Sequence, residues 1–261
     1  MESLKDKIVC ITGASSGIGA ACAVEFARHG SHLLLSARRK HRIDELANRL
    51  KQEYGVRVFS VAMDVMKQAH VASMFKSLPP EWQPIDILIP NAGLARGFAK
   101  VHEGSLQDWE EMIDTNIKGV LYTTSAVLPG MVERKRGQII LMGSIAGHDV
   151  YPSGNVYCGT KYFISALAKG LKMDLLGSGI RVCSVDPGMV QTEFSEVRFH
   201  GNRDRAAQTY ANTRPLRPED VAEIVTFCAT RPPHVDIHEV IVMSTDQASV
   251  HHVHRSVQPS Q

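Results

Sequence analysis

The 261-residue sequence lacks the features that mark several large classes of protein. No apolar run approaches the roughly 20 residues needed to cross a bilayer, and the charged N-terminus leads into a strand without a secretory leader. The net charge is only +2 with both signs interspersed, so no basic surface indicates a nucleic-acid partner. The five cysteines are odd in number and contain no C-x-x-C pair, as is typical of small buried side chains in a reducing compartment. We therefore expect a cytoplasmic protein that binds neither a membrane nor a nucleic acid.

Short apolar runs alternate with helix-length amphipathic segments along the chain, whose hydrophobic content of 44% is enough for one sizeable core. The runs are nearly continuous in hydrophobicity, which is typical of strands covered on both faces of a parallel sheet. They predict strands over residues 8–12, 32–37, 56–62, 85–90, 138–143, 180–186 and 237–243. The segments between them predict helices over residues 16–29, 40–53, 68–77, 105–132, 157–176 and 218–230.

This alternation predicts an α/β fold in which residues 1–261 form a single domain, a doubly wound sheet of about seven parallel strands flanked by helices. Two intervals depart from the pattern. Residues 189–217 are rich in charged and polar side chains, and we expect them to cover a substrate. A polar tail begins at residue 244.

A glycine-rich turn follows the first predicted strand and opens the first helix. Its spacing is G-x-x-x-G-x-G rather than the more common G-x-G-x-x-G. Glycine permits the tight turn and the close approach of a pyrophosphate to backbone N–H groups, and the helix N-terminus adds a partial positive charge. A plain strand-to-helix turn is the alternative, although three glycines would weaken such a helix start. We expect a dinucleotide to be held by Gly13, Ser15, Ser16, Gly17, Ile18 and Gly19.

Two arginines at the end of the second predicted strand distinguish between the nicotinamide cofactors. A carboxylate at this place would bind a ribose 2′-hydroxyl and repel a 2′-phosphate. The chain instead has Arg38 and Arg39, with no acid until Asp44. A guanidinium matches phosphate geometry, so the sequence favours NADP(H) over NAD. A solvated basic helix start is the alternative, although cations there oppose the helix dipole.

Tyr157 and Lys161 stand four positions apart in a predicted helix, and Ser144 follows the fifth predicted strand. Residues four apart share one helix face, with Cβ atoms about 6 Å apart. Tyrosine has an ordinary pKa of about 10, so it needs a positive charge in a partly dry site to act as a base at neutral pH. The trio therefore predicts proton transfer at a carbonyl carbon. No G-x-S-x-G sequence surrounds Ser144, which argues against a hydrolase.

Further motifs occur in order with these: Asn91-Ala92-Gly93 after the fourth predicted strand, Asn116 in the fourth helix, and Pro187-Gly188 after the sixth strand. Together they make the chain resemble the short-chain dehydrogenase/reductase family over nearly its whole length. The resemblance implies a Rossmann-like sheet, a homodimer or homotetramer with the tetramer favoured, and carbonyl–alcohol interconversion with a nicotinamide cofactor. It also implies that Ser144 binds the substrate oxygen and that Asn116 holds a water connecting Lys161 to solvent.

The resemblance extends the expected cofactor site to residues after the later strands. Asp64 is expected beside the adenine ring, although a turn or cap role explains it equally well. Pro90 replaces the asparagine that usually precedes Asn91 in the family, which removes a backbone donor and puts the adenosine side in doubt. The remaining contacts are Val65, Asn91, Ala92, Gly93, Tyr157, Lys161, Pro187, Gly188, Val190 and Thr192.

The sequence from Pro187 to Phe199 and the downstream segments around Tyr210, Pro218 and Val253 look like the subgroup that oxidises 3-hydroxy acids, serine and L-allo-threonine with NADP. A small acidic substrate would need a cation, and a guanidinium binds a carboxylate through two hydrogen bonds. The candidates are Arg96, Arg198, Arg203 and Arg205.

Alternatives remain at this point. One is an NADPH-dependent reductase of larger carbonyls, such as 3-ketoacyl or xenobiotic ketones. Another is a dinucleotide-binding regulator without turnover, which would be free to lose one of Ser144, Tyr157 and Lys161. The histidines at 251, 252 and 254 lack clustered acids or cysteines, so we expect a solvated or intersubunit tail and no metal.

Overall fold

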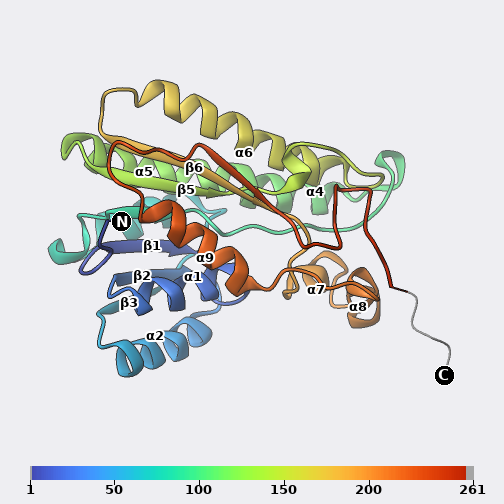
Figure 1. Ribbon diagram of the computed structural model, residues 1–261, viewed down its shortest axis with the longest axis horizontal. Helices are drawn as coiled ribbons and strands as arrows, with labels where there is room; N and C mark the ends of the chain where they lie inside the picture. The colour runs from blue at the N-terminus through green and yellow to red at the C-terminus, as the bar shows by residue number, and fades with distance from the viewer. Residues whose placement is uncertain (1, 257–261) are drawn as a thin grey trace.

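One parallel sheet of seven strands forms the centre of the fold, in the order β3-β2-β1-β4-β5-β6-β7 (Figure 1). The structure, a computed structural model, describes residues 2–256. All six strand pairs are parallel, which confirms the predicted fold class. The strands are β1 (Ile8–Thr12), β2 (His32–Ala37), β3 (Val58–Ala62), β4 (Ile87–Ile89), β5 (Gly137–Met142), β6 (Ile180–Pro187) and β7 (Glu239–Val242).

Helices cover both faces of this sheet (Figure 1). One layer consists of α1 (Gly17–Arg28), α2 (Lys40–Tyr54) and α9 (Pro218–Ala229), and the other of α3 (Gln68–Lys76), α5 (Gly119–Glu133) and α6 (Asn155–Asp174). Side chains of a strand point alternately to the two faces. Val9 and Ile11 of β1 accordingly pack with the first layer, and Ile8 and Cys10 with the second. Burial on both faces explains why the strands are nearly continuous in hydrophobicity.

The long helix expected over residues 105–132 changes geometry partway along. α4 (Leu106–Ile113) is followed by a single π-helical turn, Asp114–Lys118, and then by α5. Asn116 lies in this turn, and its side-chain amide hydrogen-bonds the backbone of Leu94 and the hydroxyl of Thr160. π turns are rare and occur frequently at functional sites. The helix predicted over residues 105–132 is therefore present as one continuous helical segment, with π rather than α geometry at Asn116, a predicted site residue.

The interval from residue 189 to 217, which we call the covering segment, contains two short helices, α7 (Phe194–Arg198) and α8 (Arg203–Tyr210). A parallel bridge between Val190 and Leu216 closes its base. After β7 the chain returns to this segment: Arg255 donates to the Ala211 carbonyl across 2.5 Å. The part of the polar tail that the structure describes, residues 244–256, thus packs beside α7 and α8 (Figure 1), and residues 257–261 lie outside the described range.

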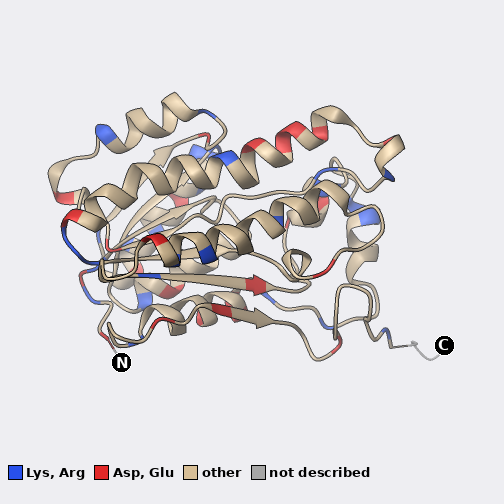
Figure 2. Cartoon of the chain, turned by 90° about the horizontal axis from the view of Figure 1, so that it is seen from above, with Lys and Arg blue, Asp and Glu red and all other residues tan. Residues whose placement is uncertain are grey.

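The helices carry mixed charge, with lysine and arginine interspersed among aspartate and glutamate (Figure 2). All five cysteines are free and buried. Within residues 2–256, no helix is both long enough and apolar enough to cross a membrane. Short 3₁₀ turns at Pro80–Trp82, Val101–Glu103 and Ile145–Gly147 complete the described elements.

Candidate active site

The predicted site residues meet at the carboxyl ends of the strands, around a cleft of about 370 Å³. The strand order reverses between β1 and β4, and in open α/β sheets ligands bind at such a switch point. Nearly all of the predicted cofactor contacts line the cleft, together with Ser144, Tyr157 and Lys161. Of the predicted residues, Gly19 and Asn116 do not line it.

The glycine-rich turn joins β1 to α1 with almost no free space behind it. Gly13 has a φ of +68°, and a methyl group there would overlap the backbone of Ala92. A methyl group on Gly19 would overlap the Asn91 side chain, whose amide donates to the Thr12 carbonyl across 2.9 Å. The two loops therefore interlock, and glycine is required where they touch. Their backbones and the N-terminus of α1 form a cradle that fits the pyrophosphate of a dinucleotide.

Pro90 does not disturb this arrangement. β4 ends at Ile89, immediately before the proline, so no sheet hydrogen bond depends on the missing N–H group. Asn91 reaches Thr12 and the Gly13 carbonyl, at 2.9 and 3.3 Å, from the position that follows Pro90.

Arg38 and Arg39 lie at the rim of the cleft but have different partners. Arg38 is 55% exposed and has one long contact, 3.8 Å to a Glu111 oxygen. Arg39 donates to the hydroxyls of Ser15 and Ser16 and forms a 2.7 Å ion pair with Glu193. The Arg38 side chain is thus available to bind a 2′-phosphate, whereas Arg39 connects the glycine-rich turn to the covering segment through its hydrogen bonds and ion pair.

Arg42 and Glu193 were missed by the sequence analysis. Arg42, on the first turn of α2, holds the second oxygen of Glu193 at 2.6 Å. Both arginines hold the pKa of Glu193 below its ordinary value, against the opposing effect of partial burial. No local pattern marks this pairing, because Arg42 and Glu193 are 151 positions apart.

Loops after β3 and β6 position other residues that were predicted to contact the cofactor. Asp64 accepts a hydrogen bond from the Met66 N–H at 3.0 Å, which is the turn role considered as its alternative, and it also lines the cleft. After Pro187, the Gly188 backbone is packed so closely against Gln247 that a methyl group would overlap the amide. Gln247 accepts from the Met189 N–H at 2.8 Å. This glutamine, in the polar tail, is a further residue that the sequence analysis missed.

Tyr157 and Lys161 lie in the first two turns of α6. Lys161 is only 8% exposed and donates to the Met142 carbonyl at 2.9 Å. Its ammonium nitrogen lies 5.9 Å from the centre of the Tyr157 ring. Burial lowers the pKa of Lys161 to about 8, although the nearby Asp186 opposes this effect. Burial raises the pKa of Tyr157 well above its ordinary value, so the polypeptide by itself keeps the phenol protonated.

Ser144 and Asn116 approach this pair from the loop after β5 and from the π turn between α4 and α5. Ser144 caps the turn Ile145–Gly147, where its hydroxyl accepts from the Ala146 N–H at 3.1 Å. The Asn116 oxygen accepts from Leu94 at 2.9 Å. A methyl group built on Gly93 would lie 3.3 Å from that oxygen and 4.0 Å from the Lys161 nitrogen. Gly93 therefore lies close to the side chains of both Asn116 and Lys161.

A second cavity of about 150 Å³ shares the Tyr157 side chain with the cleft. Its walls include the rings of Phe98, Trp109 and Tyr151 and the guanidinium of Arg198. That guanidinium lies 5.0 Å from the centre of the Tyr157 ring and donates to the Tyr151 hydroxyl at 2.8 Å. The cavity thus places a positive charge directly beside the predicted proton donor.

The four arginines considered for a substrate carboxylate differ in how they are engaged. Arg96 is held by both oxygens of Glu111, at 2.7 and 3.1 Å. The Arg203 side chain is 85% exposed and contacts Glu196, and Arg205 is exposed over the Phe199 ring. Arg198 is half-buried, lines the cavity, and has no carboxylate within ion-pair distance in residues 2–256.

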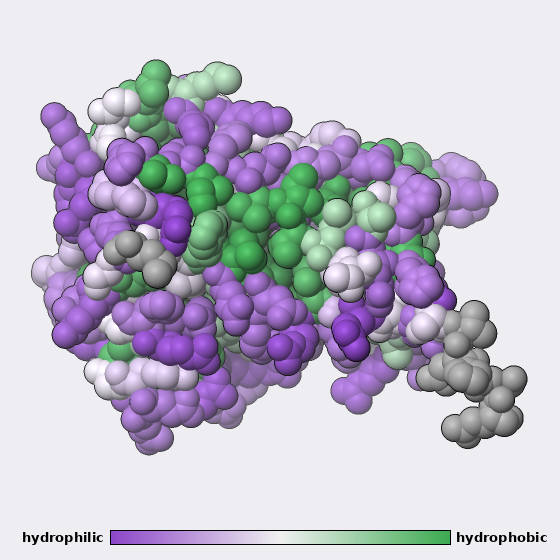
Figure 3. Space-filling view, in the orientation of Figure 1, coloured by the Kyte–Doolittle hydropathy of each residue, from purple (hydrophilic) through white to green (hydrophobic). Residues whose placement is uncertain are grey.

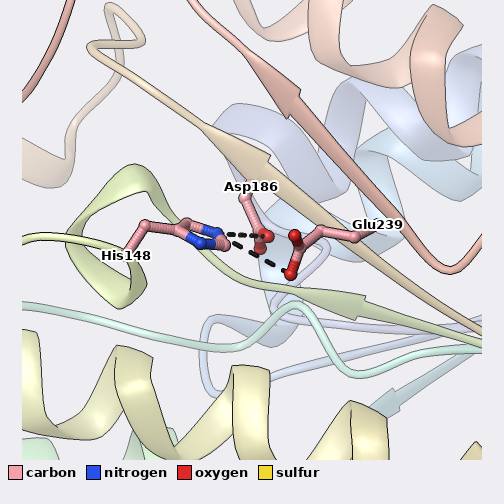
Figure 4. Close-up of side chains that lie close together, drawn as sticks. All are labelled: His148, Asp186 and Glu239. Carbon is pink, nitrogen blue, oxygen red and sulfur yellow. Dashed lines mark hydrogen bonds and ion pairs between the residues drawn. The ribbon is translucent and has the colours of Figure 1, made fainter.

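One cluster of ionisable side chains lies behind Ser144. His148, Asp186 and Glu239 place their nitrogen and oxygen atoms within 4.8 Å of one another (Figure 4). The shortest contact, 2.8 Å, joins His148 Nε2 to Asp186. The sequence analysis, which expects no metal, did not single out these residues.

Known proteins with this sequence pattern and geometry are dehydrogenases. The family model described as short chain dehydrogenase matches residues 7–203. The chain is 46% identical to the NADP-dependent 3-hydroxy acid dehydrogenase YdfG of Salmonella typhi, over 95% of this chain and 100% of that protein. It is 41% identical to an NADP-dependent 3-hydroxy acid dehydrogenase of Schizosaccharomyces pombe, over 98% and 99% of the two chains.

Among solved structures, the closed form of a serine dehydrogenase complexed with NADP+ matches with a TM-score of 0.89 and 45% identity. The match covers 95% of this chain and 100% of the other. A serine dehydrogenase from Escherichia coli matches with a TM-score of 0.80 and 40% identity, over 92% and 99% of the two chains. On the family model and on these identities, the chain belongs to the short-chain dehydrogenase family.

Proposed function

We propose that the protein is an NADP-dependent oxidoreductase that interconverts a short 3-hydroxy acid, or a hydroxy amino acid such as serine or allo-threonine, with the corresponding ketone or aldehyde. The observation that carries this proposal is the Arg198 guanidinium, which has no carboxylate partner within residues 2–256 and lies 5.0 Å from the Tyr157 ring centre. A carboxylate on that guanidinium would place the carbinol carbon, which in these substrates is two bonds from the carboxyl carbon, near the tyrosine hydroxyl. The NADP dependence of the relatives agrees with the exposed Arg38 at the rim of the cleft.

Bound NADP(H) supplies or accepts the hydride at the nicotinamide ring. The chain's own residues must then move the proton. In reduction, the Tyr157 hydroxyl gives its proton to the forming alkoxide, and the raised pKa of this phenol ensures that the proton is present. In oxidation, the same oxygen must accept the proton, which requires that nearby positive charge lower the pKa of Tyr157.

Lys161 and Arg198 supply positive charge from this chain. Lowering a tyrosine pKa by three units takes about 4 kcal/mol, which exceeds the roughly 0–1 kcal/mol of an exposed ion pair. Lys161 is buried, so its charge acts on Tyr157 with little screening. Arg198 also lowers the pKa of Tyr157. Ser144 would hold the substrate oxygen, and Asn116, which lies near Gly93 as Lys161 does, would hold the water that returns a proton to Lys161.

The dimensions of the second cavity favour a short substrate over a large one. A cavity of about 150 Å³ in a protein takes a molecule the size of benzene, which has nearly as many non-hydrogen atoms as serine. A long 3-ketoacyl chain or a bulky xenobiotic ketone would not fit without movement of Tyr151 or Phe98. Reduction of larger carbonyls is therefore the second candidate, and retention of Ser144, Tyr157 and Lys161 in one site disfavours a regulator without turnover.

The test compares pairs of substrates that differ only in charge. NADPH oxidation is followed by absorbance with short 3-oxo acids and with their methyl esters, and NADP+ reduction with serine, allo-threonine and 3-hydroxybutyrate. We expect a higher kcat/KM for each acid than for its ester. Equal values for acid and ester, or a preference for long acyl chains, would contradict the proposed substrate class.

We also propose that the protein forms homo-oligomers through the face that carries α9 and β7. β7 is the edge strand of the sheet, and Ile241 of β7 and Phe227 of α9 are each 48% exposed. Figure 3 shows apolar side chains gathered in the middle of this face. An edge strand with apolar neighbours fits a second copy of the same edge. Light scattering would test this association, and Ile241→Lys should weaken it.

We place the protein in the cytoplasm as part of the same proposal. Its support is the cysteine inventory, because all five thiols are free and buried. Free thiols persist in reducing compartments, where disulfides are rare.

A further inference from the structure

The loop from Gly143 to His148 carries Ser144 and is attached at both ends to one buried carboxylate. Asp186, on β6, has no exposed surface. At one end of the loop, it lies so close to Gly143 that a methyl group there would overlap its carboxylate oxygen. At the other end, His148 Nε2 donates to its second oxygen at 2.8 Å (Figure 4).

The first oxygen of Asp186 is also fixed, because the Ser184 hydroxyl donates to it at 2.6 Å. A buried carboxylate that is hydrogen-bonded on both oxygens has little freedom to move. The loop segment between its two contacts can therefore adopt few conformations, and Ser144 is within that segment.

The same loop connects Asp186 to Lys161. The residue before Gly143 is Met142, whose carbonyl accepts the hydrogen bond from Lys161. The negative charge of Asp186 raises the pKa of Lys161, in opposition to the larger effect of burial. Asp186 thus acts on Ser144 through the loop and on Lys161 through its charge.

We propose that Asp186 and His148 form a positioning pair for the reaction, which fixes Ser144 and helps to keep Lys161 charged. The proposal rests on the proposed function, since it assumes that Ser144 and Lys161 serve the reaction. Neither residue of the pair lines the cofactor cleft or the second cavity, so the pair acts from behind the site.

Other charged groups near the pair set the controls. Glu239 of β7 lies 3.9 Å from His148 Nε2. Asp149, the next residue along the chain, contacts His251 at 3.6 Å rather than the pair. Lys161 is the charged residue of α6 that lies near Asp186. Glu239 is the acid closest to His148 after Asp186; it pairs with Ser184 through the β6–β7 ladder, whereas the Ser184 hydroxyl donates to Asp186.

The first variant is Asp186→Asn, which preserves the shape of the side chain and removes its charge. We expect turnover to fall about tenfold through loss of alignment, with the dissociation constant for NADPH, measured by fluorescence, unchanged. The alkaline limb of the pH profile of kcat/KM should move to lower pH, because the neutral amide introduced by this substitution no longer helps to keep Lys161 protonated.

A readout without turnover accompanies this variant. The pKa of Lys161 is lowered in the folded protein to about 8 from 10.5. Between these two values the unfolded chain binds more protons at Lys161, so the contribution of Lys161 to the free energy of unfolding rises with pH, whereas the raised pKa values of buried groups such as Cys10 and Tyr157 make their contributions fall. In Asp186→Asn the rise from Lys161 should begin at lower pH, which is measured as the difference in unfolding free energy between the variant and the wild type at each pH. An unchanged pH profile and an unchanged onset would overturn the proposal.

The second pair of variants separates the hydrogen bond from the bulk of the histidine. His148→Ala should reduce kcat several-fold with little change in KM, and His148→Gln, which keeps an N–H donor, should restore most of it. Glu239→Gln is the control and should resemble the wild type. Equal loss in His148→Ala and His148→Gln would overturn the proposal, and these variants decide the matter if Asp186→Asn does not fold.

Two further outcomes are informative. Wild-type turnover should survive dialysis against EDTA; a loss would overturn the proposal in favour of a metal held by this cluster. If the wild type turns over none of the substrates, the proposed function fails, but the onset of the rise in unfolding free energy still shows whether Asp186 acts on Lys161.

Discussion

At the carboxyl edge of the sheet, Ser144 follows β5, and Tyr157 and Lys161 lie beside it on α6. This region, which we call the sheet edge, and the covering segment hold their side chains by different means. At the sheet edge, the polar contacts are buried and end on backbone groups, as in the bond from Lys161 to the Met142 carbonyl. In the covering segment, Glu193 is held by two arginines that are each about 40% exposed. Buried contacts fix geometry, whereas exposed ion pairs contribute little to stability and allow movement. We therefore expect the reacting groups to be held more rigidly than the covering segment.

The largest expected effect concerns the sheet edge. Tyr157→Phe removes the hydroxyl that moves the proton and leaves the ring in place against Phe194. We expect turnover to fall at least about 100-fold, with NADPH still bound. Tyr162→Phe is the matched control, since this tyrosine lies on the same helix and is 43% exposed. Substantial turnover in Tyr157→Phe, measured by NADPH absorbance, would place the proton donor elsewhere.

The next effect concerns the boundary between the two regions. Arg198→Met should raise KM for short 3-oxo acids about 10- to 100-fold, because a hydrogen bond to a charged group is worth about 1.5–3 kcal/mol. KM for the corresponding methyl esters should stay the same. Arg203→Met, on the exposed side of the covering segment, is the control. If acid and ester respond alike, Arg198 serves the packing of Tyr151 and Phe194 rather than the substrate.

A smaller effect is expected at the rim of the cofactor cleft. Arg38→Ala should raise KM for NADPH roughly tenfold through loss of a charge-assisted contact, and KM for NADH should not change. Arg38 suits this test because it makes only one long protein contact. Lys40→Ala is the control, because it breaks a surface ion pair with Asp44 in the first turn of α2, close to Arg38 in the sequence. A parallel rise for both cofactors would argue against recognition of the 2′-phosphate by Arg38.

The smallest effect is expected within the covering segment. Glu193→Gln releases Arg39 and Arg42 while preserving the side-chain shape, and should change the free energy of unfolding by no more than about 1 kcal/mol. Product release should become faster or slower by a measurable factor in stopped-flow experiments, with the rate of the chemical step unchanged. If Glu193→Gln lowered the free energy of unfolding as much as a core substitution does, the covering segment would be held as firmly as the sheet edge. That result would contradict the difference between the two regions.

Much of the sheet edge could be predicted from the sequence because its signals are local. The hydrophobic runs, the glycine-rich turn and the four-residue spacing of Tyr157 and Lys161 each report one element and its period. The order of the motifs then places the elements in one sheet, as the structure confirms. The sequence did not predict the π geometry at Asn116, because the hydrogen bonds of Asn116 to Leu94 and Thr160, which accompany the π turn, are tertiary.

The features of the site that the sequence analysis did not predict depend on contacts between segments that are distant in the sequence. Arg39 and Glu193 are 154 positions apart, and His148 and Asp186 are 38 apart. None of these residues stands in a periodic pattern or at a spacing that chemistry requires. The sequence did not distinguish among the four arginines considered for a substrate carboxylate. In the structure, Arg96 is paired with Glu111, whereas Arg198 lies over the Tyr157 ring. The assigned roles of Ser144, Tyr157, Lys161 and Asn116 remain predictions until the variants are measured.

Gln247 ties the polar tail to the loop that follows β6, where its oxygen accepts from Met189 and its bulk closes the space beside Gly188. Two segments separated by nearly sixty positions are therefore constrained as a unit. A substitution at Gly188 succeeds only with a smaller residue at 247, so the two positions should change together among homologous chains. For protein engineering, a deletion that removes Gln247 would free the Met189 N–H and the space beside Gly188, a residue that lines the cleft.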